Sequence, residues 1–322
     1  MMKLLKNLFT IEKNPHKGLI MAEWAVLAYI GFTLILMLFT YTRLQNPVSM
    51  LWLRFQSVMM TAALWAVYRM IPCRMTMCIR VLAQLAMLST WYPETFEFNR
   101  ILPNLDHHFA AWEQQLFGCQ PALLFSEKYS SPIVSELLTM GYVSYYPMMV
   151  VVLIYYFLHQ YEQSLKASFM VIAVFFAFYV IFIFLPVAGP QYYYSAVGTD
   201  QIAQGIFPNI GNYFETHTEG LDAPGWKDGI FYKLLIFAHE TGERPTAAFP
   251  SSHVGATVVF LILAWVSRNR KLFWSFVPFA VLMFFATFYL QAHDVIDAIA
   301  GLFAGLAIHF LLLGIYKLMG KK

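Results

Sequence analysis

Charged residues are scarce in this sequence. They make up 12% of the 322 residues, whereas hydrophobic residues make up 59%. Soluble domains are typically about 25% charged and about 45–50% apolar. The composition therefore excludes an ordinary soluble domain and predicts an all-α, polytopic helical membrane protein. The net charge of +3 is small and is not spread as a patch, so we expect no nucleic-acid partner.

Cysteine is also rare, and its spacing excludes two further classes. Cys73, Cys78 and Cys119 form no CxxC pair, which argues against a disulfide framework and a structural zinc site. We expect no cofactor. Residues 1–17 are polar and basic without a short apolar core, so no cleaved signal peptide is expected.

Long apolar runs account for most of the chain. A membrane span needs about 20 mostly apolar residues, and on this measure we expect about eight transmembrane helices. The sixth run is the shortest. The runs are 19–41, 50–70, 75–91, 132–158, 167–187, 253–266, 273–290 and 295–318.

Basic residues alternate with acidic ones along the loops between these runs. Lys and Arg near span ends mark the cytoplasmic side. The N-terminus, the even-numbered loops and the C-terminus are basic, whereas the longer odd-numbered loops are acidic. We therefore expect both termini in the cytoplasm, in a plasma membrane or, for a bacterial protein, an inner membrane. The basic residues are Lys3, Lys6, Lys13, Lys17, Arg69, Arg74, Lys166, Arg268, Arg270, Lys271, Lys317, Lys321 and Lys322.

Two outer segments are too long for simple connections. In 104–118, Leu105, Phe109, Trp112 and Leu116 recur at helical spacing, which predicts an amphipathic helix at the membrane interface that ends at Gly118. Segment 189–250 is rich in aromatic residues and is expected to form an ordered extracytoplasmic cap over a site.

A few charged residues fall within or near the apolar runs. They are Glu23, Arg54, Arg80 and Glu136. Intramembrane charges are functional candidates by default. Arg54 and Arg80 have a second interpretation, in which their long side chains extend to an interface.

The segment Arg244-Pro-Thr-Ala-Ala-Phe-Pro-Ser-Ser-His253 opens the sixth run. Ser251 or Ser252 is expected to cap a helix there, and free N–H groups at a helix start attract anions. A histidine at this place can give a proton to a leaving oxygen. The alternative is a capped helix with a surface histidine.

The segment Gln291-Ala-His-Asp-Val-Ile-Asp297 opens the eighth run in the same way. His293 and Asp297 at i and i+4 share a helix face. A carboxylate that accepts a hydrogen bond from one ring nitrogen leaves the other as a basic lone pair, which can attack phosphorus. An isolated HxxxD pair also arises by chance.

The two histidines fall on the same predicted side, at helix starts. We expect them to meet across one phosphoryl group. Arg244 is the candidate for neutralising the oxygens of the phosphoryl group. Gln191 and Tyr192 are expected at the opposite rim of the site. A metal site formed by His253, His293 and Asp297 is disfavoured, because no further ligand lies nearby in the sequence. The sequence has no GxSxG elbow, which disfavours a serine hydrolase.

These two segments resemble the signature of the type 2 phosphatidic acid phosphatase superfamily. Pro250-Ser-Ser-His253 looks like its Pro-Ser-x-His motif, and His293 with Asp297 looks like the end of its Ser-Arg-x5-His-x3-Asp motif. The resemblance implies a six-helix core and a phosphohistidine intermediate. It makes His293 the nucleophile, Asp297 its orienting base and His253 the acid.

Departures from that signature point to one branch of the superfamily. Thr287 stands at the motif's arginine position, and Phe184-Leu-Pro-Val-Ala-Gly-Pro-Gln-Tyr192 replaces the lysine-bearing segment. This proline- and aromatic-rich segment is similar to one in the inositol phosphorylceramide synthases. The segments Ala248-Phe-Pro-Ser-Ser-His253 and Thr287-Phe-Tyr289 also resemble that branch. The substrate-binding candidates are therefore Arg244, Ser251, Ser252, Gln191, Tyr192 and Thr287.

The resemblance sets the expected domains and reaction. Residues 1–75 should form an N-terminal cytoplasmic segment with two extra spans, and 76–322 a catalytic six-helix domain. The expected reaction transfers a phosphoinositol or similar headgroup to a ceramide-like lipid, at the extracytoplasmic face. A phosphatase for phosphatidic acid or polyprenyl phosphate using the same site is the alternative, and a transporter is a more remote one.

Overall fold

The chain folds as a bundle of helices. The computed structural model describes residues 7–240 and 242–319, and this part of the chain contains no strand, only an isolated bridge between Ile11 and Cys73. The fold class is therefore all-α, as the composition predicts. The bundle's longer helices are α2 (Met21–Thr40), α3 (Pro47–Met70), α4 (Arg74–Asn99), α7 (Pro132–Val143), α8 (Tyr145–His159), α9 (Tyr161–Phe184), α13 (Ser252–Val266), α14 (Arg270–Tyr289) and α15 (Val295–Met319).

Fewer helices qualify as membrane spans than the eight apolar runs predict. By length and apolar composition, α2, α3, α9, α14 and α15 qualify, and α7 with α8 make a sixth if this pair, bent by 42°, counts as one. The other two runs, which form α4 and α13, are helical but do not meet this criterion. α13 has 15 residues, a length of about 22 Å against a hydrocarbon core of about 30 Å. α4 is long enough, but it carries charged residues whose partners lie on neighbouring helices.

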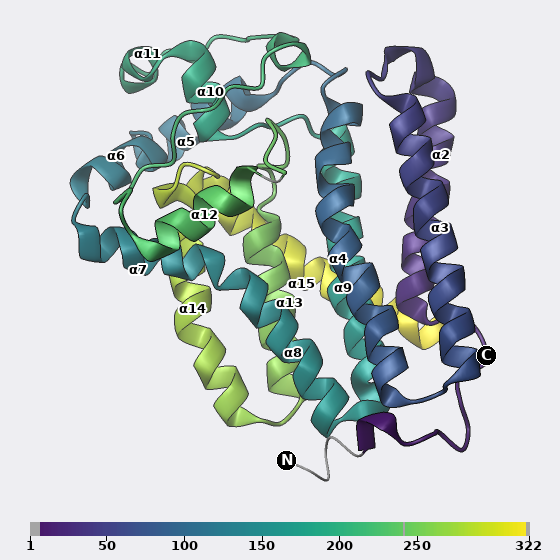
Figure 1. Ribbon diagram of the computed structural model, residues 1–322. Helices are drawn as coiled ribbons and strands as arrows, with labels where there is room; N and C mark the ends of the chain where they lie inside the picture. Colours follow the sequence, from purple (N-terminus) through teal and green to yellow (C-terminus); the bar gives the residue numbers. More distant parts are fainter. Residues whose placement is uncertain (1–6, 241, 320–322) are drawn as a thin grey trace.

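Helix α9 lies at the centre of the bundle (Figure 1). It packs against α2 and α4 on one side and against α8, α13 and α15 on the other. Most of its side chains are buried, whereas the other spans expose much of their surface, as lipid-facing helices do. The N-terminal helices α2 to α4 thus form one half of the molecule, and the histidine-bearing helices belong to the other.

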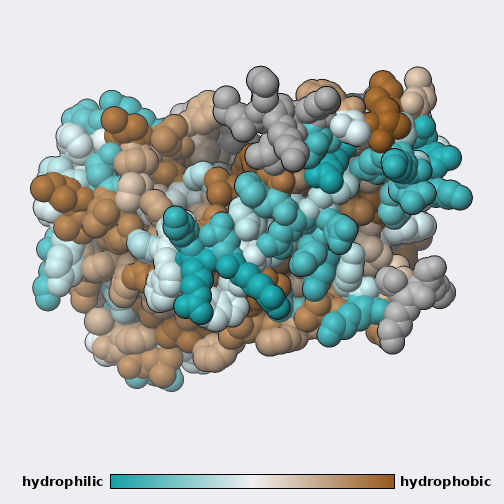
Figure 2. All heavy atoms as spheres, turned by 90° about the horizontal axis from the view of Figure 1, so that it is seen from below, coloured by the Kyte–Doolittle hydropathy of each residue, from teal (hydrophilic) through white to brown (hydrophobic). Residues whose placement is uncertain are grey.

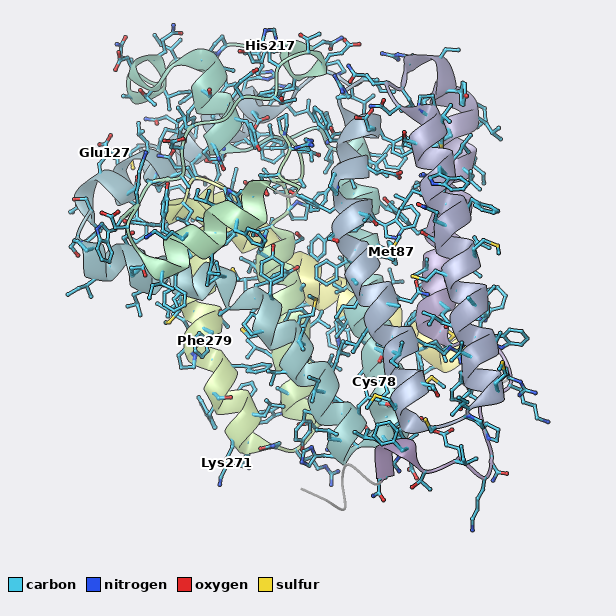
Figure 3. All side chains as sticks on the ribbon, viewed as in Figure 1. Cys78, Met87, Glu127, His217, Lys271 and Phe279 are labelled. Atoms are coloured by element: carbon cyan, nitrogen blue, oxygen red, sulfur yellow. The ribbon has the colours of Figure 1, made fainter. Side chains whose placement is uncertain are left out.

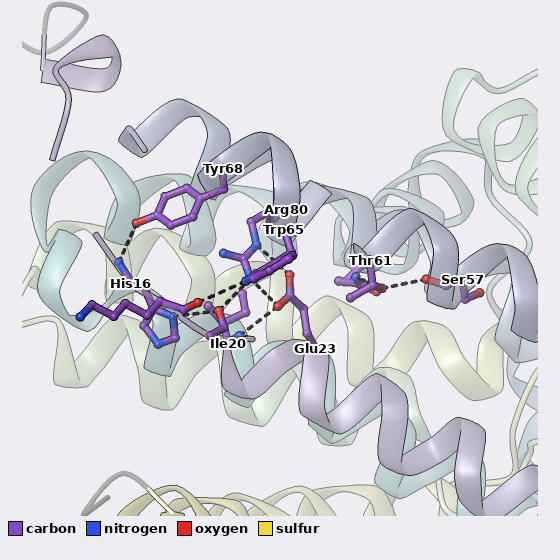
Figure 4. Close-up of polar contacts among 11 residues, drawn as sticks. His16, Ile20, Glu23, Ser57, Thr61, Trp65, Tyr68 and Arg80 are labelled. Atoms are coloured by element: carbon purple, nitrogen blue, oxygen red, sulfur yellow. Dashed lines mark hydrogen bonds and ion pairs between the residues drawn. The ribbon is translucent and has the colours of Figure 1, made fainter. Parts of the chain in front are cut away.

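Two buried ion pairs hold the N-terminal helices together. Arg80 on α4 pairs with Glu23 on α2, and both side chains are fully buried (Figure 4). Arg54 on α3 pairs with Glu94 on α4. Because a lone charge in this environment is costly, each partner neutralises the other. The interpretation that Arg54 and Arg80 extend to an interface is therefore wrong.

The two ends of the bundle differ in character. The short helices gather at the upper end of Figure 1, where Figure 3 also places His217, whereas Lys271 lies at the lower end. Figure 2 views that lower end and shows hydrophilic residues across much of its centre. The short elements are η1 (Tyr41–Arg43), α5 (Asp106–Phe117), α6 (Pro121–Lys128), α10 (Pro190–Val197), α11 (Thr199–Ala203), η2 (Tyr213–Glu215) and α12 (Ile230–Glu240).

Glycine lets α13 and α15 approach closely. A Cβ atom built on Gly305 of α15 would lie 2.4 Å from the carbonyl oxygen of Gly255 on α13, and one built on Gly301 would lie 2.5 Å from that of Ser251. Small residues allow membrane helices to pack backbone to backbone in this way. The contact fixes the starts of the two helices, and hence their histidines, relative to each other.

Replacing Gly305 with alanine should therefore destabilise the protein. The added methyl group meets main-chain atoms that cannot rotate away, so we expect a loss of about 1–3 kcal/mol, typical of overpacking. Gly314 on the same helix has nothing within 4 Å of its built Cβ atom, so Gly314→Ala is the matched control. Thermal unfolding in detergent should show a lower midpoint for Gly305→Ala alone. Equal midpoints would contradict the packing described.

Candidate functional site

Main-chain hydrogen bonds join three segments that are distant in the sequence. The Ala248 N–H donates to the Val187 carbonyl oxygen at 3.0 Å, and the Ser251 N–H donates to that of Asp297 at 3.0 Å. The Gln191 N–H donates to the Gln291 carbonyl oxygen at 2.8 Å. These bonds bring the segment after α9, the segment before α13 and the turn before α15 to one place.

His253 stands in the first turn of α13. Ser251 is the N-cap, because its hydroxyl oxygen accepts the Val254 N–H at 3.4 Å. The imidazole packs between Tyr142 and Tyr145, with ring centroids 4.6 and 4.8 Å away. Within the described residues, Nδ1 of His253 is buried and has no hydrogen-bond partner. The ring is held in place while this nitrogen stays available to a ligand.

His293 lies in the turn between α14 and α15, and two bonds orient it. Its N–H donates to the Thr287 carbonyl oxygen at 3.1 Å. Its Nδ1 lies 2.7 Å from the Ala248 carbonyl oxygen. A carbonyl only accepts, so this bond places the proton on Nδ1 and leaves a lone pair on Nε2. The residue is 3% exposed.

The rings of His253 and His293 meet edge to face. Their centroids are 5.7 Å apart and their planes are inclined by 67°. This is an ordinary contact distance for two rings. The two rings expected to meet at one site are therefore in direct contact.

Asp297 has a different partner from the expected one. Its Oδ2 atom is 3.9 Å from Nδ1 of His293, beyond hydrogen-bond range. It accepts the Asp294 N–H at 2.8 Å instead, as a third helical residue does when it caps its own helix. The expected orienting bond to His293 is supplied by the Ala248 carbonyl. Asp297 remains close enough to stabilise a positive imidazole electrostatically.

Burial sets the protonation of the groups in this turn. It lowers the pKa of His293 to about 4, although the bond to the Ala248 carbonyl acts in the opposite direction. Burial, followed by the charges of Glu113 and Asp106, raises the pKa of Asp294 well above its usual range. Near neutral pH His293 is thus uncharged, and Asp294 tends to keep its proton.

Sequence reasoning missed two acidic residues of α5 that support the site. Glu113 accepts the N–H groups of Val295 and Ile296 at 2.9 and 3.1 Å, so it caps the start of α15. Asp106 accepts the N–H groups of Ala188 and Gly189 at 2.7 and 2.6 Å. Burial raises the pKa of Asp106 to about 6. Helix α5 thereby links two of the three converging segments.

A signal for these residues exists in the sequence. Asp106, Phe109, Ala110 and Glu113 follow the i, i+3, i+4, i+7 spacing of a single helix face, and they are the buried residues of α5. Sequence reasoning used only the apolar members of the helix. Of these, Trp112 is exposed on the other side.

Three of the predicted substrate-binding side chains have structural partners instead. The Gln191 amide donates to the Leu221 carbonyl at 2.9 Å, and the Thr287 hydroxyl donates to that of Phe284 at 2.7 Å. Tyr192 is buried in a cluster with Phe96. These contacts shape the turn and the cap.

Arg244 and Ser252 complete the predicted set. The guanidinium of Arg244 is exposed and donates to the Glu243 carbonyl oxygen at 2.7 Å. It lies near enough to Tyr192 to act on its hydroxyl electrostatically. Ser252 is the first residue of α13 and is buried. Within the described residues, neither side chain forms a hydrogen bond or an ion pair with His293. Across 7–240 and 242–319, no group of three or more His, Cys, Asp or Glu side chains is placed to hold a metal ion.

Comparison with known proteins gave one match. The sequence model of the PAP2 superfamily matches residues 107–311, more than half of the chain. This stretch includes both histidines and Asp297. No curated protein and no solved structure matches the chain.

Proposed function

Because the chain belongs to the PAP2 superfamily, the type 2 phosphatidic acid phosphatases and related phosphotransferases, we propose that it transfers a lipid phosphoryl group through a phosphohistidine on His293. The chain is an integral membrane enzyme of the lipid phosphatase and phosphotransferase kind. The observation that carries the proposal is the contact of His253 with His293, two residues 40 positions apart whose rings meet in one buried place.

In the first step, Nε2 of His293 attacks phosphorus. The bond from phosphorus to the leaving oxygen breaks, and a protonated His253 gives its proton to that oxygen. The bond from Nδ1 to the Ala248 carbonyl holds the ring in the reactive tautomer. The imidazole becomes positive as it is phosphorylated, and the carboxylate of Asp297 at 3.9 Å stabilises this charge.

In the second step, a hydroxyl group attacks the phosphohistidine. It gives its proton to His253, its oxygen bonds to phosphorus, and the electron pair of the broken N–P bond returns to Nε2. The first N–H groups of α13 have no acceptor within the helix, so those of Ser252 and His253 are suited to the phosphoryl oxygens. Arg244 is exposed at the rim and can neutralise a charged headgroup from there.

We propose further that the attacking hydroxyl belongs to a lipid. The likeness of 248–253 and 287–289 to the inositol phosphorylceramide synthases supports a headgroup transferase with a ceramide-like acceptor. Burial of His293 also supports transfer, because a site that excludes water disfavours hydrolysis. The site then faces the extracytoplasmic side, opposite the basic loops, and both termini are cytoplasmic.

A donor–acceptor experiment tests this proposal. The purified protein is given phosphatidylinositol with and without ceramide, and lipid products and free inositol phosphate are measured. We expect a new phosphoinositol lipid only when ceramide is present. Release of inositol phosphate at the same rate with and without ceramide would show that the site hydrolyses its donor instead of transferring the headgroup.

The lowered pKa of His293 predicts that activity persists to an unusually low pH. Protonation of Nε2 removes the attacking lone pair, so activity should fall only as the pH approaches about 4, rather than near 6.5 as for an ordinary histidine. kcat/KM for a nitrophenyl phosphodiester donor, which does not titrate in this range and whose leaving group departs without a proton from His253, should therefore be nearly constant from pH 7 to pH 5. If kcat/KM fell at low pH with a pKa of 6.5, and titration assigned that pKa to His293, the buried and neutral ring would be contradicted.

A further inference from the structure

An apolar cavity lies beside the catalytic histidines. Its volume is about 690 Å³, within the range of about 300–1,000 Å³ typical of small-molecule sites. It is bounded by α12, by the bend between α7 and α8, and by α14, where Figure 3 labels Phe279. The side chains that matter below are Met140, Val143, Leu234, Phe237 and Phe279.

The bend between α7 and α8 shapes this cavity. The helices meet at 42°, and the hydroxyl of Ser144 donates back to the Gly141 carbonyl at 2.6 Å. Such a bond, with Pro147 in the next turn, is a known cause of helix bending. A Cβ atom on Gly141 would lie 2.4 Å from that of Leu282, so α7 touches α14 just above the bend. Below it, α8 diverges and leaves space.

Helix α12 forms the outer wall and is firmly attached at its start. Glu136 of α7 accepts the N–H groups of Phe231 and Tyr232, both at 3.1 Å. The Trp226 N–H donates to the hydroxyl of Ser135 at 2.7 Å. Glu136, an intramembrane charge in the sequence, is thus a helix cap. Figure 1 shows α12 lying across the front of the bundle.

The cavity lies close to His253, although neither histidine lines it. Tyr142 stands between the lining residues Met140 and Val143, and its ring packs on His253. At the far end of α12, Ala238 lines the cavity, and the ring of the next residue, His239, lies 6.4 Å from that of Tyr142. A molecule with its phosphate at His293 can therefore extend a chain into the cavity.

The apolar side chains that line the cavity favour a hydrocarbon occupant. Leu234 and Phe237 are 50% and 68% exposed, so the cavity is open towards the surroundings of the bundle on the α12 side. Surfaces this apolar at mid-height of a membrane bundle face hydrocarbon. We propose that the cavity holds a hydrocarbon chain of the lipid phosphoester that reacts at His293, an inference that rests on the proposed function.

The cavity acts by positioning its occupant more than by attracting it. A chain leaves bilayer hydrocarbon to enter the cavity, so little hydrophobic free energy is gained. The benefit is that the phosphate is held at the nucleophile, where small misplacements cost rate. Filling the cavity should therefore reduce kcat/KM for long-chain substrates and spare substrates whose chains are too short to reach it.

Cavity-filling variants test this inference. Leu234→Trp and Met140→Trp are compared with Leu311→Trp on the exposed face of α15. With dioleoyl phosphatidylinositol and ceramide in mixed micelles we expect on the order of a 10-fold loss of kcat/KM for the donor in the first two variants and none in the third. With dibutanoyl phosphatidylinositol as the donor all three should match the unmodified protein. Equal losses on both substrates, or no loss, would overturn the proposal.

A second measurement does not depend on turnover. Phosphatidylinositol with a photoreactive diazirine in its chain is irradiated with the unmodified protein, and labelled peptides are mapped. We expect label in 140–147 and 231–238, reduced by Leu234→Trp. Label spread evenly over the lipid-facing helices would mean ordinary boundary lipid and would reject the cavity as a chain site. Label in the cavity without turnover of any donor would instead reject the proposed reaction.

Discussion

Replacing His293 with glutamine should lower turnover by about 10⁴-fold or more, the scale of loss when a catalytic nucleophile is removed. The glutamine amide can still donate to the Ala248 carbonyl, which accepts Nδ1–H of His293 at 2.7 Å. The variant therefore removes the lone pair on Nε2 while the turn keeps its hydrogen bond. The measurement is phosphoryl transfer from a lipid donor at saturating concentration.

A matched control separates chemistry from folding. His309 is another buried histidine, on α15, whose Nδ1 has no partner among the described residues. His309→Gln should leave the rate within a few-fold of the unmodified protein. If His293→Gln kept most of its activity with an unchanged unfolding midpoint, His293 would not be the nucleophile.

Replacing His253 with glutamine should lower the rate with an alkyl donor by about 10²–10⁴-fold, the usual contribution of a general acid. The physical reason is that a lipid alkoxide is a poor leaving group unless it receives a proton. The loss should therefore shrink to about 10-fold or less in the first step when the leaving group is p-nitrophenolate, which departs without one.

The second step of the reaction gives a sharper test of this role. His253 also accepts the proton of the attacking hydroxyl, so its loss should slow the breakdown of the phosphohistidine. A nitrophenyl donor should then give a rapid burst of nitrophenolate, equal to one per enzyme molecule, followed by slow turnover. A variant equally impaired with both leaving groups and without a burst would show that His253 only supports the fold.

The sequence was sufficient for the parts of the site that depend on residue type. A histidine at each of two helix starts, one after Pro250-Ser-Ser and one four residues before Asp297, predicted two side chains that the structure places in contact. Ser251 or Ser252 was expected to cap α13, and Ser251 does so. Such features follow from local rules of capping and periodicity, which act over a few residues.

The parts of the site that the sequence did not predict depend on backbone groups and on residues distant in the sequence. The group that orients His293 is the carbonyl of Ala248, and a carbonyl leaves no mark in a sequence. Thr287 and Gln191 looked like ligands because of their position in the resembling motif. The structure uses the Thr287 hydroxyl within its own helix and the Gln191 amide on the cap.

The pairing of charged residues inside the bundle could not be predicted from the sequence either. Arg80 and Glu23 are 57 residues apart, and only the packing of α4 on α2 shows that they neutralise each other. A count of apolar residues cannot include such pairing. This explains why α4 forms a long helix within the bundle although its composition falls below that of a typical span.

The most direct test of the central claim is to trap the phosphoenzyme. The protein is mixed with a nitrophenyl phosphodiester donor labelled on phosphorus, quenched in alkali, where phosphohistidine is stable, and digested for peptide mapping. We predict label on the peptide that contains His293, accumulation of this label in His253→Gln, and none in His293→Gln. Label on Ser251 or Asp297, or turnover without any labelled protein, would contradict the account.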